Sequence, residues 1–267
     1  MIVRNMIVHL DSTPRSADRL ALAVTLAARF GARLVGVFAE ADSRLLGGSA
    51  PESEVAAAYA QAGEAFAART SAAGVTGVWR SLVHGSHHHV NKTVIEAARR
   101  ADLTVLGQHN TDDQGRAPRD LVEQVVVNSG RPVLVVPYAG NFPDVGKRAM
   151  IAWNGGRESA RAANDAIPLI QNADAVTVMA INPQGGGPLD GSGLCDHLAC
   201  HGIKAERELL SVTDIGVADY VLSHCADMGA DLLVMGAFGH YGFPYMLRGG
   251  VTKDILEQLT VPVLLAH

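Results

Sequence analysis

Four glycines near the end of the sequence stand at a spacing that suits the binding of an anion. They follow the apolar run Leu232-Leu-Val-Met235 and lead into a stretch with helical periodicity. Glycine has no Cβ, so its backbone amide can approach a ligand closely. The first amides of a helix favour phosphate because they lack partners within the helix and carry the positive end of its dipole. The predicted phosphate-binding loop comprises Gly236, Gly239, Gly249 and Gly250, with Val251 and Thr252 adjoining it.

A histidine-rich segment, residues 84–89, offers a different chemistry. Neutral imidazoles bind zinc, but a site needs three or four converging ligands, and adjacent histidines on one segment rarely converge. Gly85 and Ser86 suit a turn followed by a helix N-cap. We therefore expect His87, His88 and His89 to form the exposed first turn of a helix, and we predict no structural metal.

Histidines and cysteines also gather in residues 195–201, where His197 and His201 stand one helical turn apart with Cys200 beside them. His201 followed by Gly202 is typical of an ordinary helix end. Cys225 lies in an apolar-periodic stretch, which predicts a buried and unreactive thiol. No set of side chains suggests nucleophilic catalysis, so we assign no catalytic residue.

The elements that must position the glycine loop are found in a sequence that repeats itself. Ala101–Gly107 recurs as Ala230–Gly236, and Arg131–Val136 recurs as Val261–Ala266. The segment ending at Asp11 aligns with the one ending at Asn154. A duplicated domain follows from this self-similarity. The first copy holds about a dozen extra residues, which we place within 41–60.

Each half alternates short β-branched runs with Ala- and Leu-rich stretches, the pattern of a parallel sheet covered on both faces. We predict an α/β fold of two doubly wound, five-stranded domains, 1–138 and 148–267, joined by a linker over 138–147. The predicted strands cover 5–11, 33–39, 77–83, 103–107, 132–137, 148–154, 174–181, 204–211, 231–236 and 261–266. The predicted helices cover 15–30, 52–73, 89–101, 118–128, 157–171, 191–201, 215–229 and 250–259.

The spacing of the glycines in the second half resembles the nucleotide motif of the universal stress protein family. It reads Gly-x-x-Gly, then nine residues, then Gly with a small residue. The resemblance extends over the whole chain, which looks like a tandem member with two such domains related by a pseudo-twofold axis. It implies that the glycines hold the ribose and phosphates of ATP or another adenine nucleotide, with Mg²⁺ as an optional companion. It also implies that Asn154 contacts the nucleoside and that the region of Ile181 supplies an apolar wall for the base. Gly250 replaces the usual Ser or Thr, so the amide remains and the hydroxyl is lost.

The first half lacks this motif. Its equivalent loop begins Gly107-Gln-His-Asn110, and Arg119-Asp120 stand where the glycine pair should be. We expect the Asp120 carboxylate to satisfy the helix amides that a phosphate would need. Asp11 matches the acidic residue at the end of the family's first strand, but the glycines of the motif are absent from this half. This half is interpreted as structural, with a pocket for something other than a nucleotide.

Composition excludes several classes of protein. With 267 residues, 48% of them apolar, the chain can fill two cores, and its three cysteines fit a reducing compartment. A net charge of −5 with scattered Lys and Arg argues against nucleic acid as a partner. No apolar run reaches the roughly 18 residues of a membrane span, so we expect a cytoplasmic protein.

Three hypotheses about function remain open. The first is a stress-response or regulatory protein that binds an adenine nucleotide in its C-terminal half, hydrolyses it slowly at most, and changes its contacts with an unidentified protein partner. The second is a scaffold that works through protein contacts alone. The third is an adenylating enzyme, because residues 153–159, Trp-Asn-Gly-Gly-Arg-Glu-Ser, resemble the Ser-Gly-Gly-x-Asp-Ser loop of ATP pyrophosphatases. The two domains are expected to form an intrachain pseudo-dimer, and a homodimer of chains stays open.

Overall fold

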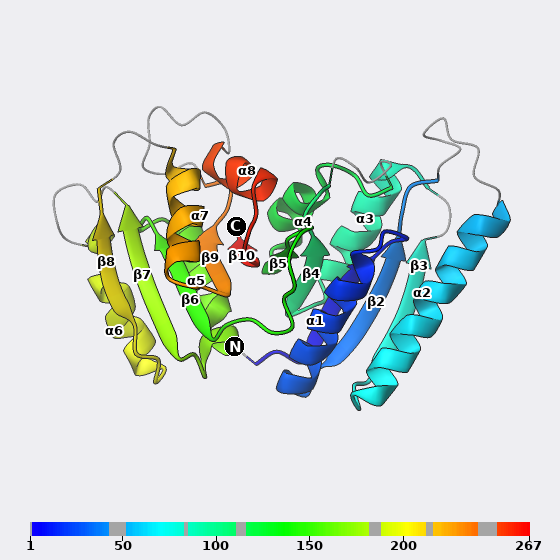
Figure 1. The fold of residues 1–267 in the computed structure, drawn as a ribbon, viewed down its shortest axis with the longest axis horizontal. Coiled ribbons are helices and arrows are strands. Elements are labelled where there is room, and N and C mark those ends of the chain that lie inside the picture. The colour runs from blue at the N-terminus through cyan, green and yellow to red at the C-terminus, as the bar shows by residue number, and fades with distance from the viewer. Residues whose placement is uncertain are drawn as a thin grey trace. The chain divides into compact units, whose positions relative to one another are not determined.

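The computed structural model describes residues 2–42, 52–82, 85–110, 116–181, 188–211, 216–239 and 250–267. It divides into two compact units, residues 2–144 and 145–267 (Figure 1). Each unit is a parallel sheet with helices on both faces, so the predicted fold class is confirmed. None of the helices in the described ranges is long and apolar enough to cross a membrane.

In the first unit the strand order is β3-β2-β1-β4-β5, and every pair of neighbours is parallel. The helices α1 and α2 contact each other on one face, and α3 and α4 contact each other on the opposite face. The chain order reverses between β1 and β4, which is where a doubly wound sheet binds ligands. The elements are β1 Asn5–Leu10, α1 Ser16–Phe30, β2 Arg33–Ala39, α2 Glu52–Ala72, β3 Gly77–Leu82, α3 His87–Ala98, β4 Leu103–Gly107, α4 Leu121–Ser129 and β5 Val133–Val136.

The second unit repeats this plan with the order β10-β9-β6-β7-β8, again with parallel neighbours. Its switch point lies between β6 and β9. The elements are β6 Arg148–Trp153, α5 Arg157–Ile170, β7 Ala175–Ile181, the short 3-10 turn η2 Pro188–Asp190, α6 Ser192–Cys200, β8 Glu206–Leu210, α7 Val217–Asp227, β9 Leu232–Gly236, α8 Gly250–Glu257 and β10 Val263–Ala266.

The extra length of the first copy is found in α2, which has 21 residues against nine in α6. Residues 43–51 of the predicted insertion lie outside the described residues. The longer helix covers an aromatic cluster in which the ring of Trp79 lies 5.3 Å from that of Phe66 and 5.9 Å from that of Tyr59. A Cβ on Gly36 would stand 2.7 Å from the Phe66 ring, so this strand position needs glycine for close packing.

The repeated Ala-Asp-Leu motif has a structural role in both units. The Asp102 carboxylate accepts hydrogen bonds from the backbone N–H groups of Arg4 and Asn5, at 2.8 and 2.9 Å. In the second unit, Asp231 accepts from three successive amides over 146–148, at 2.9 to 3.1 Å. Each aspartate therefore fixes the chain as it enters the first strand of its sheet, and residues 146–147 of the predicted linker are held in this way.

Candidate functional site

The glycine loop after β9 packs tightly against the first turn of α5. A Cβ on Gly236 would stand 2.4 Å from the backbone nitrogen of Ser159, a distance that real Cβ atoms do not adopt. A Cβ on Gly239 would stand 2.7 Å from Oε2 of Glu158. Both glycines are therefore needed for the loop to lie against the β6–α5 turn, and both flank the switch point of the second sheet.

The turn between β6 and α5 holds the Asn154 position. Its Oδ1 accepts a hydrogen bond of 2.9 Å from the Gly156 amide, while Gly155 has a φ of 73°, which favours glycine. The Ser159 hydroxyl donates to the Gly156 carbonyl at 2.9 Å. Asn154 is exposed, and its acceptor oxygen is engaged within the turn.

The start of α8 contacts the segment that follows β9. The Phe238 amide donates to Oγ1 of Thr252 at 3.4 Å, and Phe238 has a φ of 56°. Thr252 is buried and Val251 is half-buried. Gly250 begins the helix, and a Cβ there would meet nothing within 4 Å among the described residues. Gly249 lies outside the described residues.

The predicted apolar wall lies at the end of β7. Ile181 is half-buried at the end of β7, where it pairs with Leu210 of β8. Leu189, which we did not predict, lies against the β6–α5 turn: a Cβ on Gly155 would stand 2.3 Å from its Cδ2, and 41% of its surface is exposed. An exposed leucine in a polar turn is the signal that sequence reasoning missed.

Glu158 is the second residue that sequence reasoning did not place in this site. It is 4% exposed, and Arg157 donates to its Oε1 at 2.5 Å. Burial alone would raise the pKa of Glu158, but the hydrogen bond from Arg157 and the nearby charges lower it below its ordinary value. An ionised carboxylate therefore stands beside Gly239, where we expected only free amides.

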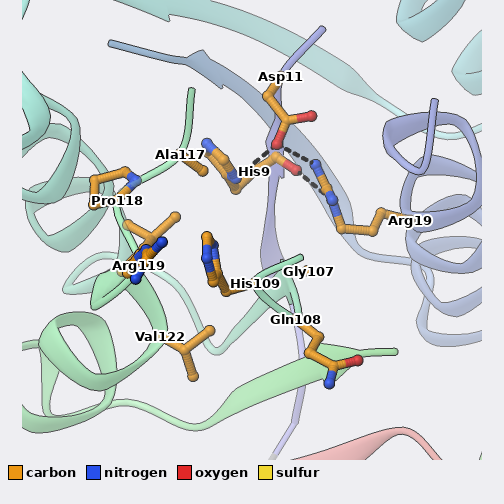
Figure 2. Close-up of a pocket in the computed structure, with 11 residues that line it drawn as sticks. His9, Asp11, Arg19, Gly107, Gln108, His109, Ala117, Pro118, Arg119 and Val122 are labelled. Atoms are coloured by element: carbon orange, nitrogen blue, oxygen red, sulfur yellow. Dashed lines mark hydrogen bonds and ion pairs between the residues drawn. The ribbon is translucent and has the colours of Figure 1, made fainter. Parts of the chain in front are cut away.

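The first unit holds a pocket at its own switch point, between the ends of β1 and β4 (Figure 2). Asp11 lies in its wall with a full set of donors. Arg19 donates to Oδ2 at 2.8 Å, and Thr13 and Ser16 donate to Oδ1. Burial alone would raise the pKa of Asp11, but Arg19 and these hydrogen bonds hold it well below its usual range.

His9, the neighbour of Asp11 in the pocket wall, is 1% exposed. Its Nε2 lies 2.7 Å from the Ala39 carbonyl oxygen, which only accepts, so Nε2 carries the hydrogen. Burial lowers the pKa of His9, which keeps the ring neutral near pH 7. The lone pair of Nδ1 then faces Asp11 Oδ2 across 4.0 Å.

Arg19 occupies the space over the first-half glycine. A Cβ on Gly107 would stand within 2.3 Å of Arg19 Nη1. Our expectation for Asp120 was wrong. It stands at the N-cap of α4, but its side chain makes no capping hydrogen bond with the described residues, and its Oδ1 accepts from Asn91 at 3.1 Å. Its φ of −92° and ψ of 7° differ from the extended conformation that aims a capping side chain at the amides.

Comparison with known proteins supports the interpretation of the second half. Residues 146–267 match the model of the universal stress protein family. The second half of this chain is a universal stress protein domain. No curated protein matches the chain.

Solved structures extend the universal stress protein fold to both halves. A universal stress protein from Archaeoglobus fulgidus matches with a TM-score of 0.73 at 15% identity, over 98% of this chain and 97% of its own. A universal stress protein of Pseudomonas aeruginosa matches with a TM-score of 0.59 at 14% identity, over 99% and 93%. A universal stress protein in complex with cAMP matches with a TM-score of 0.38 at 22% identity, over 52% and 100%.

The histidine and cysteine segments have the structural roles that we predicted. Ser86 caps α3 by hydrogen bonds to Nδ1 of His89, so 87–89 form the first turn of that helix. His201 and Gly202 end α6. Cys225 is buried, and burial raises the pKa of its thiol to about 12. Among the described residues, no group of three or more His, Cys, Asp or Glu could hold a metal ion.

Proposed function

We propose that the universal stress protein domain in the second half binds one adenine nucleotide, ATP or a hydrolysis product, and that occupancy regulates contacts with a protein partner. The observation that carries the proposal is the packing of Gly236 and Gly239 on the first turn of α5, together with the hydrogen bond from the Phe238 amide to Thr252 of α8. A loop held in this way presents backbone donors at the switch point of a parallel sheet, where ligands bind.

In the proposed complex, phosphate oxygens accept from the amides of Gly239, Gly250 and the adjoining Gly249. The exposed Asn154 side chain meets the nucleoside, since its Nδ2 can donate while Oδ1 accepts from Gly156. Leu189 lines the base together with the region of Ile181, since it lies against Gly155 and is exposed.

Glu158 sets a condition on this ligand. Its carboxylate stands beside Gly239 with the charge only partly offset by Arg157, whose side chain is 76% exposed. A chain of phosphates seated there meets like charge, which costs free energy unless a cation intervenes. The site is therefore better suited to a nucleotide with few phosphates, or to ATP accompanied by Mg²⁺.

Mass spectrometry of the denatured purified protein tests for a co-purifying nucleotide, and calorimetry with ATP, ADP and AMP then tests binding. We expect one site per chain. Gly239→Val places a branched side chain where the phosphates lie and should weaken binding by at least about tenfold, since charge-assisted hydrogen bonds contribute about 1.5–3 kcal/mol each.

Gly193→Val is the matched control, because Gly193 lies in α6 with nothing within 4 Å of its Cβ position. Two equal sites, or binding unaffected by Gly239→Val, would contradict the assignment. Complete absence of binding would leave the scaffold hypothesis in its place. Release of AMP and pyrophosphate from ATP would instead support an adenylating enzyme.

A further inference from the structure

The pocket of the first unit is not used by the proposed function, yet its lining is strongly polar. It lies at the switch point between β1 and β4, with guanidinium groups from Arg19 and Arg119 and imidazoles from His9 and His109 (Figure 2). Its cavity volume is about 20 Å³, and one water needs about 10–15 Å³ on the same measure. The pocket as it stands therefore holds about one water molecule.

One wall of this pocket presents two hydrogen-bond acceptor atoms that lie close together, His9 Nδ1 and Asp11 Oδ2. His9 Nδ1 carries a lone pair, since Nε2 donates to Ala39, and it receives no hydrogen bond from the residues the structure describes. Among the described residues, Arg19 is the sole donor of a hydrogen bond to Asp11 Oδ2. The two atoms are 4.0 Å apart, and the residues that carry them, His9 and Asp11, are 99% and 95% buried. A single O–H or N–H between them would serve both, so a bound group must bring a hydrogen to this point.

The opposite side of the pocket presents donors. Arg119 is exposed, and within the described residues it forms no ion pair. The Leu121 amide donates to the Pro118 carbonyl, but the next amides of α4, those of Val122 and Glu123, are not capped by the Asp120 side chain, which faces Asn91. Val122 lines the pocket. Free amides at a helix start and a nearby guanidinium together favour the oxygens of an anion.

The carboxylates near the pocket do not cancel this preference. Asp11 is neutralised by Arg19 at 2.8 Å. Asp120 accepts from Asn91 and is not among the residues that line the pocket, whereas Arg119 is. Arg19 also fills the space over Gly107, because its Nη1 lies where a Cβ on that glycine would stand. A nucleotide has no room over this glycine, whereas a small ion needs only a shift of the exposed Arg119 side chain.

We propose that the first-unit pocket binds a small oxyanion that retains a hydroxyl hydrogen, the chemistry of hydrogen phosphate. The hydroxyl donates to His9 Nδ1 and Asp11 Oδ2, and the remaining oxygens accept from Arg119 and the first turn of α4. Sulfate has the same shape and similar charge, but at neutral pH it carries no hydrogen to donate, so it leaves the buried acceptors unpaired. The pocket should therefore distinguish the two ions.

Calorimetry of the full chain with inorganic phosphate and with sulfate, at about pH 7, tests this proposal. We expect phosphate to bind at least about tenfold more tightly than sulfate. Arg119→Gln should weaken phosphate binding about tenfold, since it removes a charge-assisted contact. Arg100→Gln is the matched control: Arg100 is an exposed cation beyond the end of α3, near the amino end of β4, and phosphate binding should stay unchanged.

A second pair of measurements separates this pocket from the proposed nucleotide site. Gly239→Val should leave phosphate binding intact, whatever it does to ATP. Equal affinity for sulfate, phosphate binding that survives Arg119→Gln, or loss of phosphate binding in Gly239→Val would each overturn the proposal. ATP binding that is lost in Arg119→Gln would also overturn it, because the pocket would then belong to a nucleotide.

Discussion

Replacing Glu158 by Gln is the sharpest test of how the second-half site handles charge. The substitution keeps the size of the side chain and removes an ionised group that stands beside Gly239. We take about 5 Å between this carboxylate and a phosphate on the Gly239 amide, at which two unit charges repel by about 3 kcal/mol for an effective dielectric constant of about 20. Arg157 and solvent reduce this value to about 1.5 kcal/mol, or about tenfold in affinity.

The assay is calorimetry with ATP and with adenosine, both without Mg²⁺. Glu158→Gln should tighten ATP binding about tenfold and leave adenosine within about twofold, because adenosine carries no charge. Arg157→Gln should weaken the binding of ATP, since it removes the cation that lies 2.5 Å from Oε1 of Glu158. Glu206→Gln, which removes the same charge from an exposed position at the start of β8, should change neither affinity.

Parallel changes for ATP and adenosine in Glu158→Gln would refute the electrostatic reasoning, because they would indicate an effect of shape. An unchanged affinity for ATP would refute it as well. Failure of both ligands to bind even the unaltered protein would instead contradict the proposed function itself.

Two further predictions concern stability. Asp11→Asn should lower the free energy of unfolding by about 3 kcal/mol at pH 7, because it leaves the buried Arg19 without its partner. The pKa of Asp11 is lowered in the folded protein, so the stability that its carboxylate contributes is complete above the ordinary pKa of 3.8 and is lost as the pH falls further. Urea unfolding should therefore show that the difference in stability between the two proteins shrinks below about pH 4. Gly236→Ala should lower the free energy of unfolding by about 2 kcal/mol, since its Cβ would meet the backbone of Ser159. Gly193→Ala should raise the free energy of unfolding by about 0.5–1 kcal/mol, because this exposed helix position has space for the methyl group. Thermal unfolding of the two variants tests both predictions, and equal effects would contradict the steric argument.

Most of the fold could be predicted because it depends on local patterns. The β-branched runs are the buried strands, and β2 and β4 have the predicted bounds, Arg33–Ala39 and Leu103–Gly107. Helix ends were less predictable. The helix given the range 89–101 begins at His87, in agreement with the N-cap expected at Ser86, and ends at Ala98. The helix expected from residue 118 begins at Leu121, after a turn in which the Leu121 amide donates to the Pro118 carbonyl.

The side-chain environment of the sites could not be predicted in the same way. Asp120 occupies the expected cap position, but its backbone angles, which no residue pattern specifies, direct the carboxylate elsewhere. The approach of Arg19 to Gly107 joins positions 88 residues apart, and that of Glu158 to Gly239 joins positions 81 apart. Such contacts depend on the sheet order, so they become visible only when β1 is beside β4 and β6 is beside β9.

The aromatic cluster under α2 has a practical consequence for following the two units separately. The sequence contains two tryptophans, Trp79 in that cluster and Trp153 at the end of β6, next to Asn154. Each unit thus carries its own fluorophore, one surrounded by rings and the other beside the candidate nucleotide site. In a Trp79→Phe protein all indole emission comes from the second unit, and in a Trp153→Phe protein all of it comes from the first. Emission from these two proteins therefore shows which unit unfolds first in denaturant, and whether a ligand added to the chain protects one unit or both.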